Sequence, residues 1–283
     1  MIRRQQRRRM RWPKTVVLLA GVGAAVYFGH SALSSGAKDV SILAAHTVKT
    51  KQPTPKTNKT ASPVSKAPKT KALPTSYLIH VPGKDQYPQL PNGCEVTSLA
   101  MLMTAVGHPV SKMTLAAKMP VDPTKLVLGT SKTASGTVVH TTQFWGNPNV
   151  GFVGSVYKAG YGYGIYNGPM YKFLNQLLPG RAQNLTGQPF SAILAHVAEG
   201  IPVEAWTTTT FKPTTDWVTW NSPEGLVTAT PYEHAVLIVG YTPGYLYINN
   251  PLNGQAAQKV AEAPFIQAWH QLGHQAITVR KKS

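Results

Sequence analysis

Three residues that are far apart in the chain have the side chains that a thiol-dependent reaction needs. Cys94 is the only cysteine, and His234 and Asn250 follow it in chain order. A cysteine nucleophile requires a base, most often histidine, and the base requires a third group that fixes its tautomer and orientation. Cysteine with a distant histidine and asparagine is therefore a candidate catalytic set. The competing interpretation is that Cys94 is a small buried hydrophobe, as many lone cysteines are.

The phrase LPNGCEVTSLAMLM places Cys94 at the start of an expected helix over residues 92–106. Asn92 is a candidate N-cap, and Glu95, three residues later, can complete a capping box. Apolar residues at helical spacing then form one face of this helix. A thiol in the first helical turn feels the positive end of the helix dipole, which stabilises the thiolate. The sequence thus predicts a Cys94 thiol that ionises near neutral pH.

The phrases YEHAVLIVGY and YLYINNPL predict a β-hairpin that carries the other two residues. Residues 235–241 are rich in branched apolar side chains, residues 242–244 are typical of a turn, and residues 245–249 again favour a strand. His234 precedes the first strand and Asn250 ends the second, so an antiparallel pair brings them side by side. Because side chains alternate along a strand, Glu233 is expected to face away from His234 and to be structural.

Together, the segments DQYPQLPNGCEVTSLAMLM, EHAVLIVGY and YINNP resemble the papain-like cysteine peptidases of bacteria. The resemblance is to the branch related to the double-glycine leader peptidases of bacteriocin exporters, and within it to stand-alone, secreted or anchored members of Gram-positive bacteria. It covers residues 77–279. Glu95 stands directly after the cysteine, where members of the branch often have glycine.

The resemblance implies a role for each matching residue. Cys94 matches the nucleophile, His234 the general base and Asn250 the third member, which is more often aspartate in this branch. Gln86 matches the glutamine whose side-chain amide joins the oxyanion hole, and Gln89 is the less favoured choice. The backbone amide of Cys94 would be the second oxyanion donor.

The N-terminal 37 residues read as a membrane anchor or a signal peptide. Seven basic residues precede an apolar stretch over residues 16–33. This stretch is long for a signal-peptide core and slightly short for a membrane span of about 20 residues. Either interpretation leaves the basic end in the cytoplasm and the rest of the chain outside. We therefore expect an extracytoplasmic protein that is anchored to the membrane or secreted to the cell wall.

Residues 38–75 are rich in Lys, Pro, Thr and Ser, and they predict a disordered linker. In an extended state of about 3.1 Å per residue the linker spans on the order of 100 Å. Residues 1–75 contain 15 basic residues and one acid, which leaves 13 bases and nine acids, a net charge of only +4, for the remainder. The expected partners are thus the membrane, through the N-terminal segment, and anionic wall polymers, through the linker. The charge distribution excludes a nucleic-acid-binding domain.

Residues 76–283 are expected to form one α+β domain of papain-like architecture, with N-terminal helices packed on a C-terminal antiparallel sheet. No cofactor or metal is expected. The nearest candidate for a metal site is the pair His270 and His274, but Gly273 interrupts their helix and no third ligand is evident. The chain is expected to be a monomer. The expected elements are helices over residues 111–119, 169–178, 191–200 and 264–272 and strands over residues 201–208 and 275–279, in addition to those above.

The sequence therefore predicts an extracytoplasmic cysteine peptidase that cleaves peptide bonds in a peptide or protein substrate. Two alternatives remain open. One keeps the same triad but makes the enzyme a transpeptidase or a hydrolase of peptidoglycan crosslinks. The other is a non-catalytic, wall-associated binding module with a peptidase-like fold.

Overall fold

The computed structural model describes residues 72–134 and 136–281, and its centre is a seven-stranded antiparallel sheet. The strand order is β12-β11-β10-β7-β13-β6, and β1 pairs with the far end of β10. The long central strand β10 follows from the run of branched apolar residues, all of which are buried. The strands are β1 (Tyr77–Leu78), β6 (Ala182–Asn184), β7 (Val203–Thr208), β10 (Glu233–Thr242), β11 (Tyr245–Asn250), β12 (Gln255–Ala261) and β13 (Ala276–Val279).

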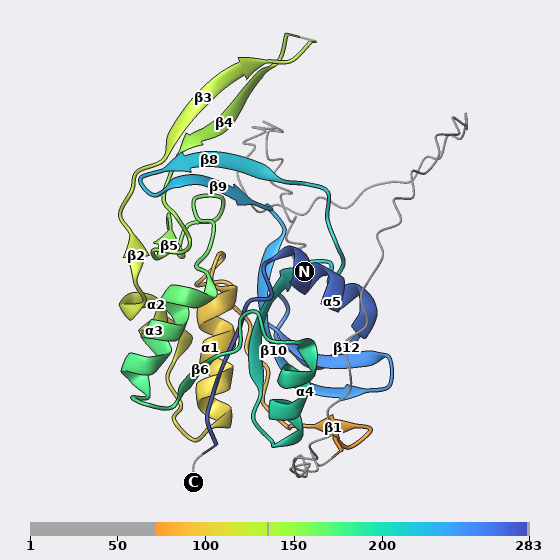
Figure 1. Ribbon diagram of the computed structural model, residues 1–283. Coiled ribbons are helices and arrows are strands. Elements are labelled where there is room, and N and C mark those ends of the chain that lie inside the picture. The colour runs from red at the N-terminus through yellow and green to blue at the C-terminus, as the bar shows by residue number, and fades with distance from the viewer. Residues whose placement is uncertain (1–71, 135, 282–283) are drawn as a thin grey trace, which may run out of the picture. The chain divides into compact units, whose positions relative to one another are not determined.

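Helices cover both faces of this sheet (Figure 1). One core contains residues of α1 (Cys94–Ala105), α2 (Lys112–Lys118) and α3 (Asn167–Leu177) together with Ala235, Leu237 and Val239 of β10. A second core contains residues of α4 (Phe190–Ala198) and α5 (Glu262–Gln271) together with Val236 and Ile238. The alternation of β10 side chains thus divides the strand between the two cores.

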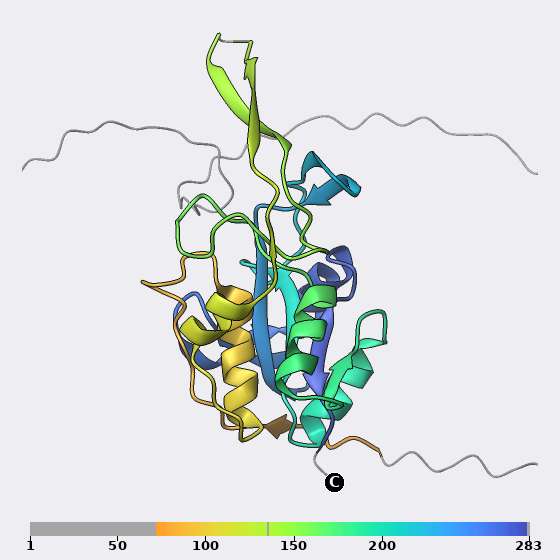
Figure 2. The ribbon, with the colours of Figure 1, turned by 90° about the vertical axis from the view of Figure 1, so that its left-hand side faces the viewer.

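A smaller four-stranded sheet has the order β3-β4-β8-β9. Its strands are β3 (Val127–Lys132), β4 (Val138–Phe144), β8 (Val218–Ser222) and β9 (Gly225–Ala229). The β3–β4 hairpin extends away from the helices and the large sheet in both views (Figures 1 and 2). Two short strands, β2 (Val121–Asp122) and β5 (Phe152–Val153), pair in parallel. Trp145 and Trp220 lie in a third core beneath this sheet.

Gly240 lets β1 cross close to β10. A Cβ atom at this position would lie 2.6 Å from the carbonyl oxygen of Tyr77, which is closer than real Cβ contacts. The β10–β11 ladder also shifts register between Ile238 and Gly240. A larger residue here would therefore displace β1 from the sheet.

The expected helices and the expected strands of the large sheet are present, and their ends differ by at most two residues from the predicted ones. The expected α+β class is correct, but α4 and α5 cover the sheet face that the predicted arrangement left open. β12 and the whole four-stranded sheet were not predicted. Gly, Ser, Lys, Gln or Ala interrupts the strand-forming residues in the segments of β3, β9 and β12, which weakens their strand signal.

The predicted anchor over residues 16–33 and nearly all of the predicted linker lie outside the described residues. Within the described ranges, no helix combines the length and the apolar character that crossing a bilayer demands.

Candidate active site

Cys94 is the first residue of α1, and its side chain is 7% exposed. The predicted cap is wrong: Gly93 is the N-cap residue, and no side chain caps the helix. Asn92 instead donates from Nδ2 to the carbonyl oxygens of Ser155 and Lys158, each at 2.8 Å. Its side chain thereby binds the cysteine loop to the loop that contains Ser155 and Lys158, a tertiary contact that local capping rules do not consider.

Glu95 turns into the protein instead of closing a capping box. Its Oε1 accepts a hydrogen bond from the backbone amide of Ile165 at 2.8 Å, and its Oε2 lies 3.3 Å from the Cys94 sulfur. Gly164 makes room for this carboxyl group, because a Cβ atom there would lie 2.6 Å from Glu95 Oε1 and 3.0 Å from Glu233 Oε2. The carboxyl group of Glu95 is thus held against the thiol by the backbone of the loop that precedes α3.

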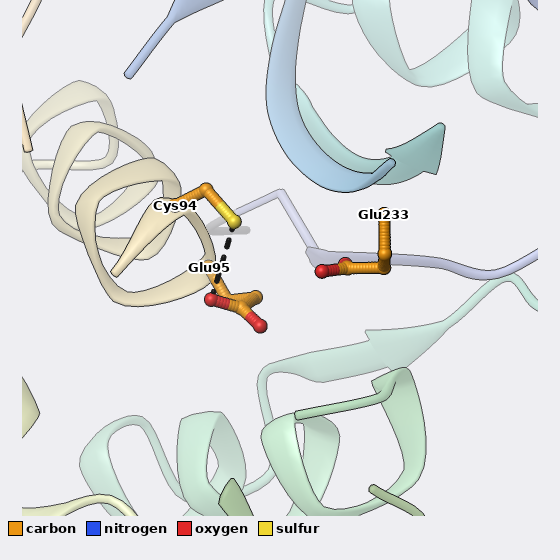
Figure 3. A group of neighbouring side chains, drawn as sticks. All are labelled: Cys94, Glu95 and Glu233. Atoms are coloured by element: carbon orange, nitrogen blue, oxygen red, sulfur yellow. Dashed lines mark hydrogen bonds between the residues drawn. The ribbon is translucent and has the colours of Figure 1, made fainter. Parts of the chain in front are cut away.

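Glu233, at the start of β10, joins this cluster (Figure 3). One ligand atom each of Cys94, Glu95 and Glu233 lies within 4.8 Å of the others, and the Glu233 carboxyl group points toward the other two side chains. Glu233 does face away from His234, as the alternation predicts. The structural role assigned to it was incomplete, because the face that it occupies is the one that carries Cys94.

His234 and Asn250 are paired, as the hairpin predicts. His234 Nε2 lies 2.9 Å from Asn250 Oδ1, and both residues are buried. The backbone amide of Leu252 donates to the same Asn250 oxygen at 3.1 Å, which identifies that atom as the acceptor. His234 Nε2 must therefore carry a hydrogen, and Nδ1 is the ring nitrogen with a free lone pair. Phe211 lies beside the imidazole, with ring centroids 6.3 Å apart.

The fold brings Cys94 to the strand that carries His234. The backbone of Ala235, the next residue, hydrogen-bonds to the Cys94 sulfur, and Ser98 Oγ donates to the Ala235 carbonyl oxygen at 3.1 Å. In this arrangement the thiol makes its side-chain hydrogen bond to Glu95, and His234 makes its own to Asn250. The thiol and the imidazole thus lie at the same end of β10 but on opposite faces of the strand, because Ala235 faces the core that contains Cys94 and His234 lies beside Phe211 of the other core. Each is bonded to another group.

The expectation of a thiol that ionises near neutrality is wrong for this arrangement. Burial raises the pKa of Cys94 well above its usual value, and the charges of Glu95 and Glu233 raise it further. The bond from the Ala235 backbone acts in the opposite direction but is the weaker influence. Burial also lowers the pKa of His234 to about 4, against a smaller opposing effect of Asn250. Both partners are therefore neutral at neutral pH.

Burial dominates the carboxyl groups as well. It raises the pKa of Glu95 to about 7, although hydrogen bonds from the backbone act to lower it. Burial raises the pKa of Glu233 well above its usual value, with further increases from the charges of Glu95 and Glu204. Glu204, on β7, is fully buried, and neither of its carboxyl oxygens has a hydrogen-bond partner in the described part of the chain. Burial raises its pKa well above the usual value.

Gln86 is buried near the site, whereas Gln89 is exposed. The Gln86 backbone amide donates to the Pro251 carbonyl oxygen at 2.8 Å, which places the residue beside the end of β11. Its Nε2 donates to the Pro91 carbonyl oxygen at 2.8 Å. A primary amide has two hydrogens, so one donor of Gln86 remains available.

The sequence interpretation missed Glu95, Glu204 and Glu233 as members of one cluster. The adjacent residues Glu233 and His234 are the one sequence signal of this cluster, and alternation along the strand favours His234 as the functional member of the two. The other candidate cluster, His270 and His274, has ring centroids 4.3 Å apart. No third His, Cys, Asp or Glu joins these two within the described residues.

Comparison with known proteins gives consistent results. The model of a family described as the Peptidase_C39 like family matches residues 78–277. The chain is 31% identical over 272 residues to YvpB of Bacillus subtilis (strain 168), a protein described as uncharacterized, and the match covers 96% of this chain and all of YvpB. It is also similar to the crystal structure of a Bacillus anthracis protein described as a C39-like peptidase. That likeness has a TM-score of 0.64 and 36% identity, and it covers 74% of this chain and 98% of the other.

Proposed function

Because this chain belongs to the Peptidase_C39 like family, we propose that it is an extracytoplasmic cysteine peptidase with Cys94 as nucleophile and His234 as general base. The observation that carries the proposal is the bond between His234 Nε2 and Asn250 Oδ1. It leaves Nδ1 as the basic nitrogen of the ring, on the residue next to the one whose backbone bonds the Cys94 sulfur.

The proposed reaction requires the Cys94 side chain to turn from Glu95 around the start of β10 toward His234, which projects from the opposite face of the strand. The sulfur attacks the carbonyl carbon of the scissile peptide bond while its proton passes to His234 Nδ1. The C–N bond then breaks, and the imidazolium returns the proton to the leaving amine. Water attacks the thioester carbonyl and gives a proton to His234; the C–S bond then breaks, the proton returns to the Cys94 sulfur, and the acid product leaves.

A neutral thiol and a neutral imidazole suit this order of events. The raised pKa of Cys94 and the lowered pKa of His234 both disfavour a resting ion pair. Proton transfer would therefore accompany attack on the bound substrate, with the substrate replacing water at the site. Asn250 fixes the tautomer throughout.

The oxyanion of the tetrahedral intermediate would be held by the Cys94 backbone amide and by Gln86. The free hydrogen of Gln86 Nε2 supplies the side-chain donor, and the bond to Pro91 holds that amide in place. Donors that are fixed before the charge develops stabilise a transition state without reorganisation.

The location is proposed from the N-terminal sequence. Seven bases before an apolar stretch, followed by a Lys- and Pro-rich segment, favour a domain held outside the membrane by an extended tether. The substrate would then be a peptide or protein of the cell envelope.

A second candidate function is a non-catalytic wall-associated binding module. One observation favours it: the Cys94 thiol is buried against Glu95 and Glu233, and its pKa is raised rather than lowered. In that case the thiol would be unreactive toward acylating agents whatever the pH of the assay.

Labelling with a thiol-directed acylating probe, in the presence of a metal chelator, tests the proposal. The wild-type chain should be labelled once, C94A should not be labelled, and H234A should be labelled far more slowly. H270A is the matched control, because its histidine is exposed and lies outside the site. Undiminished labelling of C94A, or equal labelling of H234A and H270A, would contradict the proposal, and a wild-type chain that resists labelling would favour the binding module.

A further inference from the structure

The thiol and the two carboxyl groups beside it converge at a spacing that suits a metal ion. Their ligand atoms lie within 4.8 Å of one another, and Cys94 Sγ and Glu95 Oε2 are 3.3 Å apart. In a tetrahedral zinc site with usual bond lengths, a sulfur and an oxygen ligand are separated by about 3.6 Å. Small side-chain rotations therefore suffice to make the three atoms share one ion.

One oxygen of the cluster has no hydrogen-bond partner among the residues that the structure describes. Glu233 is only 9% exposed, and its carboxyl group points toward Cys94 and Glu95 (Figure 3). Within the described residues, its buried Oε1 makes no hydrogen bond. A buried polar atom without a partner costs about 1–3 kcal/mol. This oxygen has a ligating lone pair and nothing in the described chain to use it.

The surroundings hold the ligands in place. The Ile165 amide binds Glu95 Oε1, so Oε2 is the oxygen turned toward the sulfur. Gly164 keeps the space between the two carboxyl groups open. Such outer hydrogen bonds orient metal ligands and sustain affinity in known sites. Within the described residues, no lysine or arginine side chain is seen to hydrogen-bond to Glu95 or Glu233, so no cation of the protein is seen to take the place of a metal ion.

We propose that Cys94, Glu95 and Glu233 bind one divalent cation of the zinc type, with water as the fourth ligand, and that this ion reversibly blocks the nucleophile. A thiolate with two carboxylates selects a borderline-soft ion such as Zn²⁺ over Mg²⁺ or Ca²⁺, which prefer sites made of oxygen alone. Binding releases the thiol proton and any proton on the two carboxyl groups to solvent, and it engages the sulfur lone pair in the metal bond. The blocking effect rests on the proposed function, whereas the binding itself does not.

Binding is measured on the full chain after removal of metal with EDTA. Zinc is titrated in competition with a chelating dye, and Co²⁺ is used as a spectroscopic substitute. We expect one ion per chain, a thiolate-to-cobalt charge-transfer band, and protection of Cys94 from iodoacetamide that EDTA reverses. E233Q should weaken zinc binding at least about 10-fold, since it removes a ligand. C94S should lose the cobalt band.

E224Q is the matched control, because Glu224 is an exposed glutamate on the β8–β9 turn. It should bind zinc as the wild type does. Equal zinc affinity in folded E233Q and wild type, or cobalt binding without the thiolate band, would overturn the proposal by placing the ion elsewhere. If circular dichroism shows that E233Q does not fold, E95Q replaces it and should bind zinc more weakly than the wild type. The wild-type cobalt spectrum should still show the thiolate band; equal zinc affinity in E95Q or a missing band would overturn the proposal.

The two proposals fail separately. A chain that the acylating probe labels in EDTA but that binds no zinc contradicts only the metal site. A chain that binds zinc through Cys94 but resists the probe in EDTA contradicts only the peptidase.

Discussion

His234 and Asn250 face each other from neighbouring antiparallel strands, with Nε2 2.9 Å from Oδ1. The Asn250 amide is held at both ends, since its oxygen also accepts from the Leu252 amide and its nitrogen donates to Gln258 Oε1 at 2.9 Å. The orientation of the imidazole is thus set by the backbone at the end of β11. A neutral amide does this without stabilising the imidazolium as a carboxylate would.

Replacing Asn250 with aspartate should raise the pKa of His234 from its depressed value of about 4. A carboxylate beside the ring favours its charged form. Because the base must be neutral to accept a proton, the acidic limb of the pH–rate profile for hydrolysis of an activated ester should move to higher pH in N250D. NMR titration of the His234 ring gives the pKa directly. N250A, which loses the bond, should not raise it, and an unchanged titration in N250D would contradict the assignment.

Replacing Glu95 with glutamine should make Cys94 more reactive. The Glu95 charge and its hydrogen bond both raise the pKa of the thiol, so their loss increases the thiolate fraction at a given pH. The midpoint of iodoacetamide alkylation, measured in EDTA, should fall to lower pH in E95Q. E224Q should alkylate as the wild type does. A midpoint that stays constant or rises in E95Q would show that the carboxylate does not govern the thiol.

Replacing Gln86 with alanine should slow Cys94-dependent ester hydrolysis by about 10²–10³-fold, the usual loss for one oxyanion donor. Gln89 offers the matched control, since it lies three residues away and is exposed. Q89A should retain the wild-type rate. The melting temperature of Q86A should stay close to that of the wild type, because the backbone bond to Pro251 does not depend on the side chain. Thermal unfolding checks this. Equal rates for the two variants would remove Gln86 from the site.

Replacing Glu204 with leucine should stabilise the protein, and more so at alkaline pH. The pKa of Glu204 is raised in the folded state, so the folded state binds more protons than the unfolded one, and wild-type stability falls as pH rises above the unfolded value of about 4.5. The variant removes this dependence together with two unpartnered oxygens, with a gain of about 1–3 kcal/mol. Urea unfolding of wild type and E204L at pH 6.5 and 8.5 measures the difference. This range lies above the window between about 4 and 6.5 in which His234 titration has the opposite effect. A difference that does not grow with pH would contradict the assigned shift.

Much of the fold could be predicted because its signals are local. A hairpin is specified by signals within one continuous stretch of sequence: the apolar run over residues 235–241, the turn after it and the strand that ends at Asn250. The pairing of His234 with Asn250 follows from that hairpin alone. The α1 helix was also evident from its apolar spacing, although not where it begins.

The carboxyl cluster could not be predicted, because it depends on how distant elements pack. Glu95 comes from α1, Glu204 from β7 and Glu233 from β10, and only the pairing of β7 with β10 and the packing of α1 on them bring the three together. Sequence rules treat a glutamate as a surface residue or a cap. The same limit applies to Asn92, which precedes the N-cap residue Gly93 and donates to two carbonyl oxygens of another loop instead of capping the helix.

That choice by Asn92 has a consequence for the start of α1. A capping side chain would occupy first-turn amides and contribute about 1 kcal/mol to the helix. With glycine at the N-cap and the asparagine engaged elsewhere, no side chain competes for the amide of Cys94. The helix gives up local stability there, and its first-turn amides stay available to an acceptor from outside the helix, as the proposed oxyanion hole requires.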